Sequence, residues 1–160
     1  MDETIEQVLQ FRVGPAFFCL DVRQIHRAIL LTALEPLPGA PHWVAGLLND
    51  GGESMIALDP ALWLGLGRQS PYDLGTPMLL CHTRQGPVCL IVDEIDKVRQ
   101  VSAEDWVTDM PAWNRRLGAG QGVRLSRGLA FLLDPGLPLV ELAAQGRGDA
   151  ATPDLPRLRP

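Results

Sequence analysis

The sequence predicts a mainly β protein in which short strands form small barrels or a sandwich and only short helices occur. Sixteen glycines and fourteen prolines make up about 19% of the 160 residues, against an average near 12%, and this excess argues against a helical bundle. Apolar residues make up 46% and charged residues 21%, which is typical of a globular chain with its own core. Short apolar runs separated by turn residues indicate about nine or ten strands.

The first part of the chain predicts three strands. Apolar and polar residues alternate over residues 5–13, which is typical of a half-buried strand. A glycine and a proline then form a turn, and the apolar run 16–20 predicts a strand that is covered on both faces. Asp21 is expected to cap a single helical turn, and the third strand is expected over residues 28–34.

The strongest hairpin signal follows a proline-rich stretch. Two apolar segments, 43–48 and 54–58, flank the sequence Asn-Asp-Gly-Gly at 49–52, which is typical of a tight turn between two strands. Asp59 and Pro60 then predict the N-cap and the first residue of a short helix. A glycine a few residues later is expected to end this helix.

The second half of the chain predicts another hairpin and a less regular region before two final strands. Residues 93–97 are strongly polar and are expected to form a turn or a short helix. Ser102, three residues before Asp105, resembles a weak capping box at a helix start. The other expected elements are strands at 78–81 and 88–92 joined by a turn at 84–87, a strand that begins at 98, an irregular region over 108–122, strands at 123–126 and 129–133, and a terminal helical turn at 138–144.

A faint internal repeat predicts that the chain is made of two similar halves. Residues 19–25, CLDVRQI, and residues 89–95, CLIVDEI, are identical at four of seven positions with an offset of 70. Each half is then expected to form a strand–turn–strand barrel of about 70 residues. Residues 144–160 are rich in Gly, Asp, Pro and Arg, so we expect a flexible tail after a single domain of two interlocked sub-barrels that spans 1–143.

The charge balance argues against several classes of protein. The net charge is −5 and Lys97 is the single lysine, so a basic surface for nucleic acid is not expected. Residues 1–7 lack the basic and apolar regions of a signal peptide. No apolar run approaches the roughly 20 residues of a membrane span, so we expect no membrane insertion and a cytoplasmic location. Three widely separated cysteines imply no disulfide framework.

A search for reactive groups leaves one candidate. Cys81 adjoins His82, and Cys89 lies across the predicted hairpin, so two thiols and an imidazole come near one pair of strands. Adjacent strand residues point to opposite faces, however, so Cys81 and His82 do not easily act together. The spacing lacks CxxC and HxxxH patterns, and no catalytic residue, metal site or cofactor is expected. A thiol- or metal-dependent sensor or enzyme that uses these three residues stays open as the alternative function.

Residues 38–52, PGAPHWVAGLLNDGG, resemble a stretch of the CheW family in which a proline and a short hydrophobic segment precede the pattern Gly-x-x-Asn-x-Arg-Gly. Four further segments resemble other motifs of this family in the same order, so the likeness runs from about residue 5 to residue 143. These segments are Met55–Asp59 against Val-x-Asp-Leu, Trp63–Gly65 against a Leu-Gly helix, Val88–Ile95 against Gly-Leu-x-Val-Asp-x-Val, and Leu129–Asp134 against a closing Leu-Leu-Asp strand.

The resemblance implies two five-stranded SH3-like barrels side by side, with a few short helices. It also implies a non-enzymatic adaptor that couples the signalling tips of chemoreceptors to the regulatory domain of a CheA-type histidine kinase in a bacterial chemosensory pathway. In the family, one barrel end docks on the kinase and a groove between the barrels takes the receptor tip. A third interpretation, an SH3-like oligonucleotide binder, is opposed by the acidic charge balance.

The chain departs from the family pattern at the hairpin. Gly51 stands where the family usually has arginine, and Asp50 where it often has leucine. Losing a guanidinium removes up to five hydrogen-bond donors, which points to a divergent pathway, such as a non-flagellar one for pili or surface sensing, or to other partners. The expected partner-binding residues are Asn49, Asp50 and Gly51 on the hairpin and Asp93, Glu94 and Lys97 on the matching turn of the other half, with Gly46 and Gly52 shaping the hairpin turn.

Overall fold

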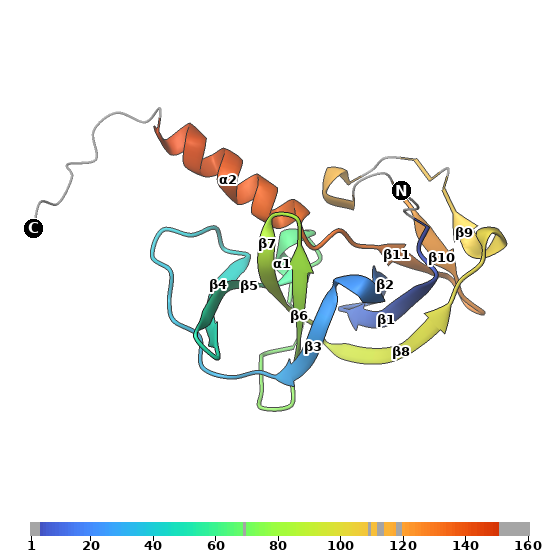
Figure 1. Cartoon of the computed structure of the whole chain (residues 1–160), viewed down its shortest axis with the longest axis horizontal. Helices are drawn as coiled ribbons and strands as arrows, with labels where there is room; N and C mark the ends of the chain where they lie inside the picture. The colour runs from blue at the N-terminus through green and yellow to red at the C-terminus, as the bar shows by residue number, and fades with distance from the viewer. Residues whose placement is uncertain (1–3, 69, 109, 112–113, 118–119, 151–160) are drawn as a thin grey trace, which may run out of the picture.

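The computed structural model describes residues 4–150 except 69, 109, 112–113 and 118–119. These residues form a six-stranded sheet A, in the order β8-β1-β2-β11-β10-β9, and a five-stranded sheet B, in the order β3-β6-β7-β5-β4 (Figure 1). The predicted mainly β class is confirmed, and sheet A has a sixth strand because the two-residue β9 pairs with β10.

The strands are β1 (Gln7–Val13), β2 (Ala16–Asp21), β3 (Ile25–Leu30), β4 (Val44–Asp50), β5 (Glu53–Leu58), β6 (Pro77–Thr83), β7 (Gly86–Ile91), β8 (Glu94–Gln100), β9 (Trp106–Val107), β10 (Gly122–Arg124) and β11 (Leu129–Leu132). The helical segments are the 3-10 helices η1 (Val22–Gln24), η2 (Ala103–Asp105) and η3 (Arg115–Leu117) and the α-helices α1 (Pro60–Trp63) and α2 (Leu137–Ala150).

The two halves of the chain exchange strands. The hairpin β1–β2 in sheet A corresponds to the hairpin β6–β7 in sheet B, with the offset of 70 residues that the sequence repeat predicted. The strand that follows each hairpin crosses to the other sheet, because β3 pairs with β6 and β8 pairs with β1. The internal repeat is therefore confirmed. The prediction that each half forms its own barrel is wrong, because each sheet combines strands from both halves.

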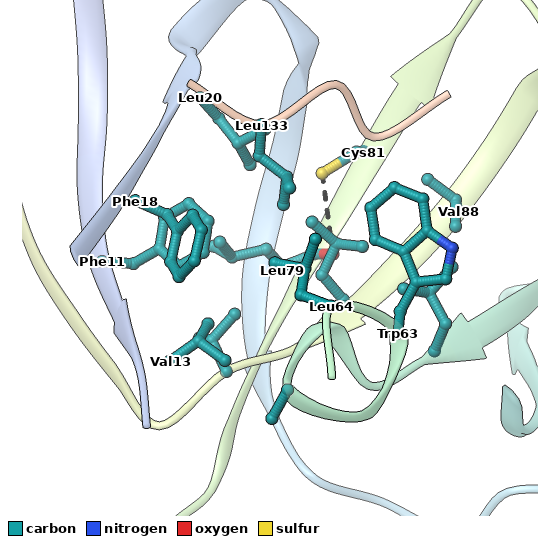
Figure 2. Close-up of a cluster of buried hydrophobic side chains, with 14 of the residues drawn as sticks. Phe11, Val13, Phe18, Leu20, Trp63, Leu64, Leu79, Cys81, Val88 and Leu133 are labelled. Carbon is teal, nitrogen blue, oxygen red and sulfur yellow. Dashed lines mark hydrogen bonds between the residues drawn. The ribbon is translucent and has the colours of Figure 1, made fainter. Parts of the chain in front are cut away.

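One apolar core joins the two sheets. Phe11 and Phe18 of sheet A belong to the same buried cluster as Leu79 and Val88 of sheet B and Trp63 of α1 (Figure 2). Burying a side chain of this size stabilises the fold by about 1.5–3 kcal/mol, so separating the sheets would cost several such contributions. Smaller clusters fill the remaining faces, with Leu48, Met55, Met78, Leu80, Cys89 and Ile91 among those in sheet B and Val8, Cys19, Val123 and Ala130 in sheet A.

Strand β1 is buried on both faces rather than on one, which corrects the prediction of a half-buried strand. Phe11 faces the shared core, and Val8 faces the smaller cluster of sheet A. Gln10 is also buried, and its amide nitrogen donates a hydrogen bond of 2.7 Å to Asp96. The alternation predicted exposure because it could not show that a second layer covers the polar face.

The local signals at turns and helix starts are confirmed. Asp21 caps η1 by accepting a 3.0 Å hydrogen bond from the amide of Arg23, and Asp59 caps α1 by accepting one of 2.9 Å from the amide of Ala61. Strand β3, however, covers Ile25–Leu30 rather than 28–34. Ile25 is already extended at the end of η1, and the partner strand β6 begins at the residue paired with Leu30.

Helix α2 continues to Ala150, beyond the expected terminal turn at 138–144, so residues 144–150 are helical rather than part of a tail. Ala143, Ala144 and Gln145 favour the start of this continuation because alanine and glutamine are good helix formers, whereas Gly146 disfavours it. Glu141 anchors the first half of the helix by accepting hydrogen bonds from Arg116 of η3 at 2.7 and 3.0 Å and from the Trp63 indole at 3.2 Å. The helix leads away from the sheets (Figure 1), and residues 151–160 of the expected tail lie outside the described residues.

Candidate functional site

The tip of the β4–β5 hairpin is an exposed two-residue turn. Gly51 and Gly52 form it with φ of 59° and 89°, and two successive positive φ values are typical of a type I′ turn. Asn49 is exposed, whereas Asp50 forms an ion pair with Arg27 of β3. Because β3 and β4 are the two edges of sheet B, this pair joins those edges. Asn49 and the turn glycines are therefore open to a partner, and Asp50 is engaged within the sheet.

Gly46 lies within β4 rather than in the turn, which corrects its predicted place. A Cβ atom at this position would lie 2.6 Å from the carbonyl oxygen of Glu35 and 2.9 Å from the Cβ of Leu34. Glu35 also forms a β-bridge with Leu47, so the chain that follows β3 passes against β4 here. Glycine is required because the two backbones approach too closely for a side chain.

Asp93 lies in a partly buried network at the junction of the two sheets rather than in a fully exposed turn. Its side chain is 16% exposed, and it accepts hydrogen bonds from the amide of Gly14 at 2.5 Å and from Arg68 at 3.0 Å. Arg68 also pairs with Asp59, whose side chain is 1% exposed. Gly14 lies between β1 and β2, and Asp93 between β7 and β8, so the network fastens the exchanged strand β8 to both sheets.

The sequence prediction missed Arg68 and Tyr72, which complete this network. The Tyr72 hydroxyl donates a hydrogen bond to Asp59, and the Arg68 guanidinium lies 4.5 Å from the centre of the Tyr72 ring. Burial and the bond with Asp59 raise the pKa of Tyr72 above its ordinary value. Burial alone would lower the pKa of Arg68, but the hydrogen bonds and charges of Asp59 and Asp93 raise it. Both residues lie in a loop without periodicity, where no local signal marks a partner.

Glu94 and Lys97 lie on a strand rather than in a polar turn, because β8 pairs antiparallel with β1. Both side chains are exposed. Glu94 forms an ion pair of 3.6 Å with Arg12 of β1. The predicted residues therefore occupy two separate places, with Asn49 and Gly51 at the tip of sheet B and Glu94 and Lys97 on the edge of sheet A.

The predicted thiol–imidazole site does not form, so this hypothesis is wrong. Cys81 pairs with Val88 across the β6–β7 hairpin and Cys89 pairs with Leu80, so the two sulfurs lie on opposite faces of the sheet and in different apolar clusters. Burial raises the pKa of each thiol to about 12, which keeps both protonated near neutral pH and unreactive as nucleophiles. Over the described residues, no three His, Cys, Asp or Glu side chains are placed to hold a metal ion.

Two edge strands expose large apolar side chains. Strand β3 is an edge of sheet B and β8 is an edge of sheet A. Leu30 at the end of β3 is 61% exposed, and Val98 on β8 is 54% exposed. Apolar side chains on an open sheet edge are a feature of surfaces that bind other proteins. Each of the two edge strands therefore exposes an apolar side chain, and the two are equivalent strands of the two halves.

Residues 7–139 match the family model of the CheW-like domain. This stretch contains all the strands that the structure describes in both sheets. The chain belongs to the CheW-like family. The family resemblance predicted from the ordered motifs is thereby confirmed.

One curated protein and one solved structure are similar to this chain. The chemotaxis protein CheW of Rhizobium meliloti (strain 1021) is 26% identical over 99 residues, which cover 62% of this chain and 63% of that protein. The match therefore spans less than two thirds of the length of this curated relative. The crystal structure of the scaffolding protein TtCheW from Thermoanaerobacter tengcongensis superposes with a TM-score of 0.73 at 13% identity, over 85% of this chain and 89% of that one. This likeness confirms the predicted fold of two side-by-side SH3-like units.

None of the helices in the described part of this CheW-like chain is both long and apolar enough to cross a membrane.

Proposed function

We propose that this CheW-like chain is a non-enzymatic adaptor that couples chemoreceptors to a CheA-type histidine kinase in a cytoplasmic chemosensory pathway. The observation that carries the proposal is the family match over residues 7–139, which takes in the strands of both sheets. The two similar proteins are described as a chemotaxis protein and a scaffolding protein. No cofactor, nucleic acid or catalytic residue takes part in the proposed role.

The proposed mechanism is positional. The shared core and the exchanged strands hold the two sheets as one body, so partners bound at different sheet edges keep a set spacing. A close-packed protein core does not deform continuously. A partner that displaces one sheet edge therefore also shifts the opposite edge, where the second partner binds. An adaptor of this kind passes a conformational bias from receptor to kinase without making or breaking a covalent bond.

We assign the partner contacts to two surfaces. The first is the hairpin tip with Asn49 and Gly51, and the second is the edge strand β8 with Glu94, Lys97 and Val98. All five residues are exposed. Asp93 has a different role in this proposal, because its bonds to Gly14 and Arg68 position β8 rather than meet a partner.

Gly51 supports a divergent pathway, such as a non-flagellar one. A Cβ atom added at Gly51 would meet no atom within 4 Å, so the position has room for the arginine that the family usually carries. The φ of 59° favours glycine. A partner that docks on this tip therefore meets backbone groups and Asn49 instead of a guanidinium, and it needs no carboxylate to pair with an arginine there.

Isothermal titration calorimetry tests the proposal. The full chain is titrated with the regulatory domain of each CheA-type kinase and with the signalling tip of each chemoreceptor from the same genome. We expect binding to at least one kinase domain and one receptor tip. Absence of binding to every kinase domain and every receptor tip overturns the adaptor function.

A matched pair of variants tests the β8 surface. Val98→Asp places a charge on an apolar contact, and we expect at least about tenfold weaker binding of one of the two partners, because burying a carboxylate without a pairing cation is costly. Arg124→Glu changes an exposed residue on β10 of the same sheet and serves as the control with unchanged binding. Equal affinities for Val98→Asp and the unaltered chain would remove β8 from the interface.

A further inference from the structure

Two of the three histidines of the chain lie side by side on the surface of sheet B. The rings of His26 on β3 and His82 on β6 have centroids 5.0 Å apart and planes 76° apart, and both residues are exposed. The register of β3 against β6 shifts between Ile25 and Arg27, so His26 is the extra residue of a β-bulge. A bulge re-aims a side chain, and here the imidazole lies against His82.

The separation of the rings fits two imidazoles that share one metal ion. A zinc–nitrogen bond is about 2.0–2.1 Å long, and the ring centre lies roughly 1.1 Å beyond the nitrogen, so two imidazoles at a tetrahedral angle hold their centroids about 5 Å apart. The observed distance of 5.0 Å therefore needs only side-chain rotation for the two ring nitrogens to converge on an ion. Exposed side chains rotate on the picosecond to nanosecond timescale, so this adjustment is easily reached.

We propose that His26 and His82 form a surface site for a divalent transition-metal ion, with Zn²⁺ as the expected ion. Imidazole nitrogen is a preferred donor for zinc, copper and nickel and a poor one for magnesium. Two protein ligands leave coordination positions open for water or for a donor from a bound partner. The cation next to His26, Arg27, is ion-paired with Asp50, which offsets its repulsion of a bound metal ion.

The site would connect the two halves of the chain. His26 belongs to β3, which the first half supplies, and His82 belongs to the hairpin β6–β7 of the second half. An ion on this pair therefore ties an exposed edge strand to the interior of sheet B. This inference rests on the histidine geometry alone and stands apart from the adaptor function.

Calorimetric titration with ZnCl₂ tests the site in the full chain, with MgCl₂ as a hard-cation probe. We expect one Zn²⁺ per chain and no uptake of Mg²⁺. His26→Gln and His82→Gln each remove one of two chelating ligands, and we expect at least about tenfold weaker zinc binding in each variant, because the second ligand then no longer binds intramolecularly. His42→Gln alters the third histidine and is the matched control with unchanged binding.

Both substitutions lie at exposed positions, and circular dichroism checks that each variant keeps the fold. Absence of zinc binding to the unaltered chain overturns the proposal and leaves an edge-to-face ring contact. Zinc binding that His26→Gln and His82→Gln leave unchanged also overturns it, since the ion then lies elsewhere.

Discussion

The exchanged strands β3 and β8 occupy equivalent places in the two halves, but the connections that lead into them are fastened differently. The connection before β3 is closed by a local pair in which Arg23, with a side chain 57% exposed, donates a 2.7 Å hydrogen bond to Asp21. The connection before β8 is closed by Asp93, which bonds Gly14 and Arg68 far away in the sequence. The Asp21–Arg23 pair is local in sequence and its guanidinium is exposed, whereas in the long-range Arg68–Asp93 pair both side chains are at most 16% exposed.

The two junctions share the same strand exchange but differ in how strongly their side chains are expected to stabilise it. Both strands cross between the sheets with the same pairing pattern, so the exchange itself does not depend on how its connection is held. The buried network, however, contains the charge of Asp59 at 1% side-chain exposure. A charge at that depth requires its partner. The junction at β8 is therefore expected to be sensitive to single substitutions, and the junction at β3 to be tolerant.

The largest effect is expected from Arg68→Ala. Removing the guanidinium leaves the buried Asp59 carboxylate without its cation and leaves Asp93 with only the Gly14 hydrogen bond of its two, so the free energy of unfolding should fall by about 3–5 kcal/mol. Urea denaturation of the variant and the unaltered chain measures this difference. The matched variant Arg23→Ala, at the other junction, should lose about 1 kcal/mol or less. Equal losses in the two variants would contradict the contrast between the junctions.

A smaller loss is expected from Asp93→Asn. The amide keeps one acceptor oxygen but loses the charge that pairs with Arg68, and it cannot accept from both Gly14 and Arg68 as the carboxylate does. The free energy of unfolding should fall by about 1–3 kcal/mol, again measured by urea denaturation. Hydrogen exchange should locate the loss in β8 and spare β3, and a loss spread evenly over both strands would argue against a local fastening.

The pH dependence of the β3 junction sharpens the comparison. Partial burial would raise the pKa of Asp21, but its hydrogen bonds with Arg23 lower it below the ordinary value. A lowered pKa in the folded state stabilises the fold above the unfolded-state pKa, near about 3.9, and this contribution is lost as the pH falls through the folded-state pKa.

Asp21→Asn tests that dependence. The variant should be less stable than the unaltered chain by about 1 kcal/mol or less at pH 7, and the difference should shrink as the pH falls below about 4. Urea denaturation at a series of pH values measures it. A difference that stays constant down to pH 2 would show that the Asp21 charge does not stabilise this junction.

The smallest effect is expected from Glu94→Gln on β8. Its ion pair with Arg12 is 3.6 Å long, and the two side chains are 66% and 38% exposed. Exposed pairs of this kind contribute about 0–1 kcal/mol and are screened by salt. We expect a stability change of about 0.5 kcal/mol or less that disappears in 1 M NaCl, as measured by thermal unfolding. A loss as large as that of Asp93→Asn would place Glu94 within the fastening of β8.

The predictions that succeeded rest on local chemistry. The hairpin turn at Gly51 and Gly52 and the caps at Asp21 and Asp59 depend on neighbouring residues within a few positions of the chain. The failures share the opposite feature. The polar residues around Glu94 and Lys97 predict a turn, because no residue nearby in the sequence indicates that this segment pairs with strand β1. The local pattern does not show that Gly46 lies inside a strand, because the segment that packs against it, at Leu34 and Glu35, belongs to another part of the chain.

The sequence by itself determined the mainly β class, the positions of the hairpins, the repeat with its offset of 70 residues and the family. Only the tertiary structure decided which sheet each strand joins, that the partly buried Asp93 bonds Gly14 and Arg68, and that His26 contacts His82. Strands pair through backbone N–H and C=O groups that nearly all residues share. The side chains therefore determine where a strand forms much more than they determine which neighbouring strand it pairs with. Burial of a polar side chain depends in turn on the layers that this pairing places over it.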